Sequence, residues 1–143
     1  MRLLRGCSAI LTALCLLVPV SAGSDTAVVP ILMYHHFTLD PTCANGNCIT
    51  ADALEEQLAA LFRAGYHGVT VADCIRFVDS GTSLPDKPIL FTADDGYRSV
   101  LDIALPMMDQ YGFPLSAAVI GSHIDADTDG IPHFTIDEAE NDP

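Results

Sequence analysis

Basic residues are scarce in this sequence. Of its 143 residues, 6 are lysine or arginine and 19 are aspartate or glutamate, which gives a formal net charge of −13. Lys87 is the single lysine. Proteins that bind nucleic acid or anionic membrane surfaces hold phosphates with clustered Lys and Arg, so we expect neither partner. A surface dominated by one sign of charge indicates a self-repelling, water-exposed domain.

The sequence also lacks an apolar run long enough to span a bilayer comfortably. The run Ala9–Val20 has about 12 residues, whereas a spanning helix needs about 20. It follows a short basic start and precedes small residues that end at Ala22. This pattern predicts a signal peptide over residues 1–22, with an uncleaved anchor as the alternative. We expect the remainder, 23–143, to be one domain secreted to the periplasm, cell envelope or medium, without a stable membrane span.

Three cysteines follow the signal peptide. Cys43 and Cys48 bracket the turn-forming stretch Ala-Asn-Gly-Asn in a chain bound for an oxidising compartment, which predicts a local disulfide. A zinc pair is disfavoured because no second Cys or His pair has a matching spacing. Cys74 falls in an apolar helical pattern, so we expect a buried free thiol.

Apolar, β-prone runs alternate with helical patterns along the chain. Strands are expected over Val28–Tyr34, His67–Val71, Pro88–Ala93 and Leu115–Ile120. Helices are expected from a Thr50 cap to a stop at Gly65, over Val71–Asp79, and over Arg98–Tyr111 with a kink at Pro106. Repeated strand–helix units predict an α/β fold with a parallel sheet and outer helices. Periodicity alone does not choose between an open sheet and a closed barrel.

Two adjacent carboxylates follow the strand expected over Pro88–Ala93. The stretch Thr92-Ala93-Asp94-Asp95-Gly96 places them where α/β folds build their sites, at the carboxyl end of a strand. Adjacent strand residues point opposite ways, so one acid could hold a metal while the other takes a proton, unless the strand breaks there. The alternative is a pair of acids that caps the next helix.

Four segments in one order extend this motif. They are P-I-L-M-Y-H-H-F (30–37), L-E-E-Q-L-A-A-L-F-R-A-G-Y (54–66), L-P-D-K-P-I-L-F-T-A-D-D-G-Y-R-S (84–99) and Y-G-F-P-L-S-A-A-V-I-G (111–121). Together they resemble the polysaccharide deacetylase family, carbohydrate esterase family four, over essentially the whole mature chain. The resemblance implies the N-terminal part of a distorted (β/α) barrel that hydrolyses N-acetyl or O-acetyl groups on a polysaccharide.

The resemblance also implies roles for single residues. Asp94 matches the general base, and Asp95 matches a ligand of a divalent metal, most often zinc. His35, from the M-Y-H segment, would line the site, although a structural strand-end histidine is the alternative. The backbone N–H of Tyr97 could donate to the oxyanion of the reaction. The substrate would be an acetylated polysaccharide whose identity the sequence does not give.

Two departures from the family pattern stand out. Ala93 replaces a phenylalanine beside the two acids, so we expect a small cavity or compensation by a neighbour. The sequence stops at Pro143, before the family's later histidine pair and general acid. We therefore expect an incomplete domain with weak zinc binding, marginal stability, association through an open sheet edge, and no activity on its own. An inactive carbohydrate-binding remnant and a calcium-binding secreted module are the alternatives.

The remaining polar residues receive plainer interpretations. His123 and His133 are expected to be exposed loop histidines, with metal ligation as the alternative. His36 and His67 are expected to be structural. Asp125–Gly130 begins like a calcium loop, but Ile136 stands where a bidentate glutamate is needed, so a solvated acidic turn is favoured.

Overall fold

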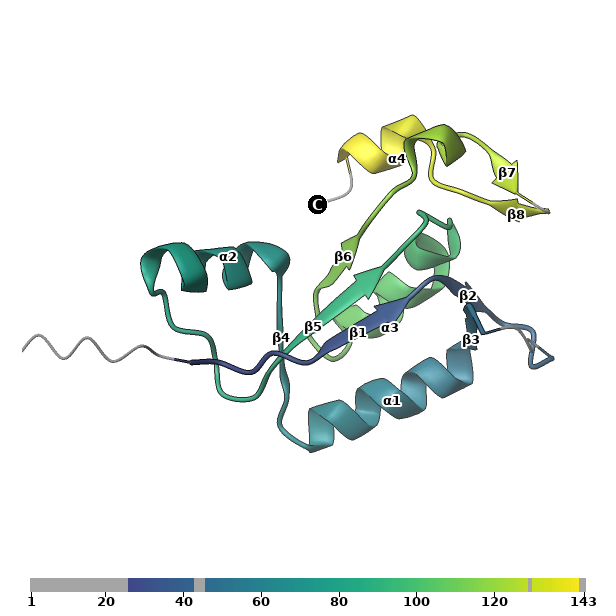
Figure 1. The fold of residues 1–143 in the computed structure, drawn as a ribbon. Helices are drawn as coiled ribbons and strands as arrows, with labels where there is room; N and C mark the ends of the chain where they lie inside the picture. The colour runs from purple at the N-terminus through teal and green to yellow at the C-terminus, as the bar shows by residue number, and fades with distance from the viewer. Residues whose placement is uncertain (1–25, 43–45, 129, 142–143) are drawn as a thin grey trace, which may run out of the picture.

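The computed structural model describes residues 26–42, 46–128 and 130–141, so the expected signal peptide, 1–22, lies outside the described residues. At the centre of the fold is a four-stranded parallel sheet (Figure 1). Its strands are β1 (Ile31–Tyr34), β4 (His67–Val69), β5 (Pro88–Ala93) and β6 (Leu115–Ala117). The predicted α/β class with a parallel sheet is confirmed.

Strand β5 is the centre of this sheet. On one side β1 pairs with it, from Ile31 opposite Leu90 to Tyr34 opposite Ala93. The other side is shared, because β4 pairs with the first half of β5 and β6 pairs with the second half. Strands β4 and β6 therefore follow one another along the same edge of β5.

The bounds of β5 agree with the prediction. Ile89, Leu90, Phe91 and Ala93 are all buried, which is expected for a parallel strand covered on both faces. Ala93 is fully buried within the main hydrophobic core. The position at which the family has phenylalanine therefore remains part of the core.

The other predicted strands are longer than the observed ones. β1 begins at Ile31 because Pro30 has no N–H to donate to the sheet, although its carbonyl accepts a bond from Leu90 N at 3.0 Å. β4 ends at Val69 because Thr70 turns to cap the next helix. Strand β6 is also shorter than expected.

Helix α1 (Ala51–Arg63) begins as its sequence predicts. The Thr50 hydroxyl accepts a hydrogen bond from Ala53 N at 3.2 Å, which satisfies one of the free donors of the first turn. The chain leaves the helix through Gly65, whose φ of 77° suits glycine. Both predicted ends of this helix are confirmed.

Helix α2 (Val71–Ser80) is capped by a reciprocal box. Thr70 N donates to Asp73 Oδ2 at 2.8 Å, and Asp73 N donates to the Thr70 hydroxyl at 3.1 Å. The hydrogen bond from the Thr70 backbone N–H is the main reason that the pKa of Asp73 lies below its usual value. Cys74 in this helix is free but half-buried, so the expected burial of its thiol is wrong.

The helix predicted over 98–111 divides into two kinds of turn. A π-helical segment, η1 (Val100–Ala104), precedes α3 (Leu105–Asp109), and Leu105 N bonds to Val100 O across the wide turn. Pro106 has no N–H for the bond that a regular α-helix needs at this point, and the wide turn lies immediately before it. The predicted kink at Pro106 is therefore a π-helical turn upstream of the proline.

Helices α1 and α3, together with η1, contribute to one core with the sheet. This core continues past β1 and reaches the segment after residue 132. Its buried members are Tyr34, Phe37, Leu54, Leu58, Ile89, Phe91, Ala93, Val100, Ala104, Met108, Phe113 and Phe134. In contrast, α2 has no buried residue.

Two short strand pairs were not predicted. β2 (His36–Thr38) pairs in parallel with β3 (Cys48–Thr50), between the strand expected to end at Tyr34 and the helix cap expected at Thr50. β7 (Asp127–Thr128), within the expected acidic turn, pairs antiparallel with β8 (Ile131–Pro132), which follows that turn. Figure 1 places both pairs toward the end of the sheet to which β1 and β5 point. They extend the fold at the edge where the candidate site lies.

The disulfide prediction concerns this same region. Cys48, at the start of β3, is disulfide-bonded. Cys43, its expected partner, lies outside the described residues. The pairing of these two cysteines stays a prediction.

Because β4 and β6 share one side of β5, we expect even a methyl group at Gly68 to lower the stability of the fold. A Cβ at Gly68 would lie 2.5 Å from Pro114 Cδ and 3.0 Å from Phe113 Cα, so the chain entering β6 blocks any side chain there. Gly68→Ala should lower the free energy of unfolding by about 1–3 kcal/mol. Urea unfolding followed by tyrosine fluorescence measures this loss. Gly121→Ala is the matched control, because a Cβ there meets nothing within 4 Å, and an equal loss in both variants would contradict the packing argument.

A second prediction concerns His36 in β2. Its Nδ1 lies 3.0 Å from Ser99 Oγ, and burial lowers its pKa below 6.5. The unfolded chain therefore takes up this proton first as the pH falls, and folded stability should decrease from about pH 7.5 to pH 5.5. His36→Gln should flatten that slope in unfolding measurements across this range. Parallel slopes for the two proteins would show that His36 does not supply the dependence.

Candidate active site at the carboxyl end of β5

The two acids lie in a tight turn directly after β5. Asp94 N donates to Tyr34 O at 2.9 Å, which extends the pairing with β1 by one bond. Asp95 and Gly96 then both adopt left-handed backbone, with φ of 71° and 73°. Left-handed backbone is uncommon for residues other than glycine, although aspartate tolerates it better than most. Such strain is concentrated at functional sites, so the turn is a candidate catalytic element.

The turn also removes the alternation that a continued strand would impose. The strand ends at Ala93, and the direction of the backbone changes at Asp95. The carboxylates of Asp94 and Asp95 are therefore not forced onto opposite faces of the sheet. Both residues are half-buried, so their carboxylates lie near the surface at the carboxyl edge of the sheet.

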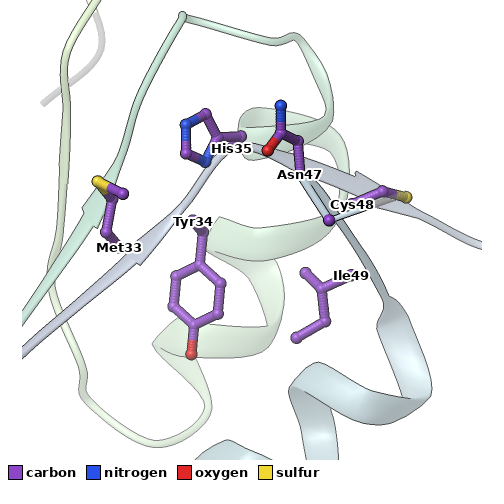
Figure 2. Close-up of a pocket in the computed structure, with 7 residues that line it drawn as sticks. Met33, Tyr34, His35, Asn47, Cys48 and Ile49 are labelled. Carbon is purple, nitrogen blue, oxygen red and sulfur yellow. The ribbon is translucent and has the colours of Figure 1, made fainter. Parts of the chain in front are cut away.

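His35 lies at the corresponding end of β1. Because Tyr34 is opposite Ala93 in the parallel register, His35 and Asp94 follow at neighbouring strand ends. Neighbouring strands are about 4.8 Å apart, so the backbones of these two residues are adjacent. In Figure 2 the His35 ring lies beside Asn47, while the Tyr34 ring extends in the opposite direction. The Tyr34 hydroxyl donates to Gln57 Oε1 of α1 at 2.8 Å.

A small pocket adjoins His35. Its volume is about 70 Å³, enough for a few water-sized groups but far below the size of a sugar ring site. It opens between β1 and β3, and its lining residues are Met33, Tyr34, His35, Gly46, Asn47, Cys48 and Ile49. The described residues therefore place His35 in the wall of a small pocket, whose lining includes no residue of the acid turn.

Gly96 lets the loop after β6 approach this turn closely. A Cβ at Gly96 would lie 2.9 Å from Val119 Cγ1 and 3.3 Å from Val119 Cα. The residue also has positive φ, so both space and backbone conformation require glycine here. Packing on Val119 restrains the acid turn from the β6 side.

Tyr97 holds the other side of the turn. It forms an isolated antiparallel bridge with His133, flanked by Phe134 N donating to Gly96 O at 2.8 Å and Arg98 N donating to Pro132 O at 2.9 Å. In this pattern the N–H of the bridged residue points out of the pair. The Tyr97 N–H thus lies outside this ladder, as its predicted role toward an oxyanion requires. That role stays a prediction.

An ion pair links the acid turn to the last helix, α4 (Ile136–Asn141). Arg98 Nη2 lies 2.8 Å from Glu138 Oε1. Thr135 N donates to Glu138 Oε2 at 2.9 Å, and this bond is the main cause of the lowered pKa of Glu138. The helix begins at Ile136 because Thr135 serves as its cap, with the Thr135 hydroxyl accepting a bond from Glu138 N at 3.3 Å.

The two loop histidines differ from their prediction. His133 is only 3% exposed, so its expected exposure is wrong. Its ring lies 4.6 Å from that of Tyr97 and 4.9 Å from that of His123, centroid to centroid. No local sequence pattern predicts the burial of His133, because this burial arises from the contact between the segments around residues 97 and 133. The His36 ring also packs against that of Tyr97, tilted by 59° with ring centroids 5.4 Å apart, which supports its structural interpretation.

The described residues do not complete a metal site around the acids. Carboxylate oxygen and imidazole nitrogen are donors that zinc accepts, so Asp95 and His35 fit the ion by type. Among residues 26–42, 46–128 and 130–141, however, no group of three or more His, Cys, Asp or Glu side chains could hold a metal. Asp125 of the expected acidic turn accepts a bond from Ile136 N at 3.4 Å. The role of Asp95 as a metal ligand stays a prediction.

No family model matches the sequence. The chain is nevertheless 33% identical over 81 residues to the poly-beta-1,6-N-acetyl-D-glucosamine N-deacetylase of Escherichia coli K12. The match covers 57% of this chain and 12% of that protein.

Two solved structures share the fold. IcaB from Ammonifex degensii aligns with a TM-score of 0.64 and 25% identity, over 75% of this chain and 44% of that one. A de-N-acetylase from Aggregatibacter actinomycetemcomitans aligns with a TM-score of 0.62 and 24% identity, over 68% of this chain and 39% of that one. The chain thus spans less than half the length of these relatives. The predicted fold class, part of a deacetylase-type (β/α) barrel, is confirmed, and the chain is similar to part of the polysaccharide deacetylases.

Proposed function

We propose that this chain carries part of the active site of a secreted hydrolase that removes acetyl groups from a polysaccharide. The observation that supports the proposal most strongly is the strained turn at Asp95, which directly follows the central strand and lies beside the end of β1. The E. coli relative is by name an N-deacetylase of poly-beta-1,6-N-acetyl-D-glucosamine, so an N-acetylated glucosamine polymer is the favoured substrate. Such a polymer is uncharged and would not be repelled by a chain of net charge −13.

Hydrolysis of an acetamide needs a nucleophilic water, a group that takes its proton, and a donor for the developing oxyanion. In the proposed mechanism Asp94 accepts the proton from water, and His35 at the neighbouring strand end helps to orient the reacting groups. The Tyr97 N–H donates to the oxyanion. The strained turn fixes these groups relative to one another before substrate binds.

A divalent metal, with zinc favoured because it accepts carboxylate oxygen, would be held in part by Asp95. When bound, such an ion lowers the pKa of water and polarises the acetyl carbonyl. The other ligands would come from outside the described residues. The left-handed backbone at Asp95, which directly follows Asp94, supports this division of roles.

Secretion is part of the proposal. It rests on the signal-peptide pattern of residues 1–22 and on the disulfide-bonded Cys48, which fits an oxidising compartment. Among the described residues, no helix is long and apolar enough to cross a membrane.

The proposal predicts separate losses for the two acids. In the intact protein that contains this chain, Asp94→Asn should lower kcat for acetate release about 10²–10⁴-fold while metal binding is kept, because only proton transfer is removed. Asp95→Asn should instead weaken the binding of zinc. Acetate release from N-acetylglucosamine oligomers and calorimetric zinc titration measure the two effects.

The control for these variants is Asp79→Asn, an exposed acid near the end of α2. It should leave both quantities within about twofold of the unmodified protein, since a surface substitution away from the site has little effect. Full activity of Asp94→Asn would refute the assignment of the base. Unchanged zinc affinity in Asp95→Asn would refute the assignment of the ligand.

A further inference from the structure

His133 is the one buried polar or charged residue of the described chain. It is 3% exposed, and neither its Nδ1 nor its Nε2 has a hydrogen-bond partner among the described residues. A buried polar group without a partner is rare and destabilising, so an unpaired imidazole in this position calls for a ligand.

His123 adds a further nitrogen at the same place. Its ring packs edge-on against that of His133, with centroids 4.9 Å apart and planes at 68°. The Nδ1 of His123 is also buried without a partner. Three unpaired imidazole nitrogens of two neighbouring rings are therefore buried in one small region.

The backbone holds this pair in place. His133 N donates to Ala126 O at 3.1 Å, and Ala126 N donates to His123 O at 3.0 Å. His123 ends the 3₁₀ turn η2 (Gly121–His123), and its N–H donates to Ile120 O at 2.8 Å. The two rings are thus preorganised by main-chain bonds and need no ligand to bring them together.

We propose that His123 and His133 form a two-histidine site for a divalent transition metal such as zinc. Imidazole is a preferred ligand of zinc, nickel and copper. Two imidazoles bound to one zinc at about 2.0–2.1 Å, with near-tetrahedral angles, hold their ring centroids about 5 Å apart. The observed 4.9 Å agrees with this separation. No third His, Cys, Asp or Glu of the described chain joins the pair, so the two imidazoles are the ligands that these residues supply.

This site has a structural role. The Tyr97 ring packs against that of His133 with centroids 4.6 Å apart, and the N–H of Phe134, the next residue, donates to Gly96 O at 2.8 Å. A metal that joins η2 to the segment after β8 therefore stiffens the strand-like segment that supports the acid turn. The site is separate from the proposed zinc ligand Asp95.

The test uses the intact protein, freed of metal with a chelator and then titrated with zinc. Zinc should shift the NMR signals of the His123 and His133 rings and raise the Tm by an amount that grows with zinc concentration. His123→Gln should abolish the ring shifts and weaken zinc binding at this site more than about tenfold, since one of two ligands is lost. Because His123 is half-buried, this variant avoids the folding risk of replacing His133.

Two further variants separate this site from the proposed active site. Asp95→Asn should keep the zinc-induced shifts of both histidine rings, and so should His67→Gln at the exposed start of β4. Absence of any shift at His123 and His133, as expected if a buried water satisfies them, would overturn the proposal. So would shifts and stabilisation that survive His123→Gln and disappear in Asp95→Asn. Neither of these two results bears on the assignment of Asp94 as the base, which the measurement of acetate release tests separately.

Discussion

The pairing of β5 on both of its sides is the interaction on which the rest of the structure depends. Strand β1 occupies one side, while β4 and β6 divide the other between them. This arrangement buries β5 almost completely and places its neighbours in a single parallel register. It also requires glycine at residue 68, where the chain entering β6 leaves no room for a side chain.

The same pairing determines what happens at the end of the strand. Parallel strands bring their carboxyl ends to one edge, so the residue after Tyr34 and the residue after Ala93 become neighbours without any further contact. The chain then reverses through two left-handed residues, Asp95 and Gly96. Packing from the β6 side and pairing with the segment after β8 hold that turn, and this support offsets the cost of its backbone conformation.

Much of this architecture follows from local signals in the sequence. Thr50 and Gly65 mark the ends of α1 because capping and left-handed backbone are local requirements. The bounds of β5 follow from an apolar run bordered by Pro88 and two acids. The acid pair itself was found from its position after that run, although its left-handed turn was not foreseen.

The features that were not predicted depend on contacts between distant segments. The pairs β2–β3 and β7–β8 have two or three residues per strand, too few to give a periodic pattern. The burial of His133 results from its bridge to Tyr97, a residue far away in the sequence. The π-helical turn before Pro106 shows how the helix accommodates the missing N–H of the proline. The sequence predicts only a kink at this point and does not give its form.

The central claim is that the ends of β1 and β5 form one catalytic unit. A double-mutant cycle between His35→Gln and Asp94→Asn, with kcat/KM for acetate release by the intact protein, tests it most directly. If the two residues act on the same reacting groups, the double variant loses much less activity than the product of the two single losses. Losses that multiply independently would show that His35 and Asp94 do not share a site.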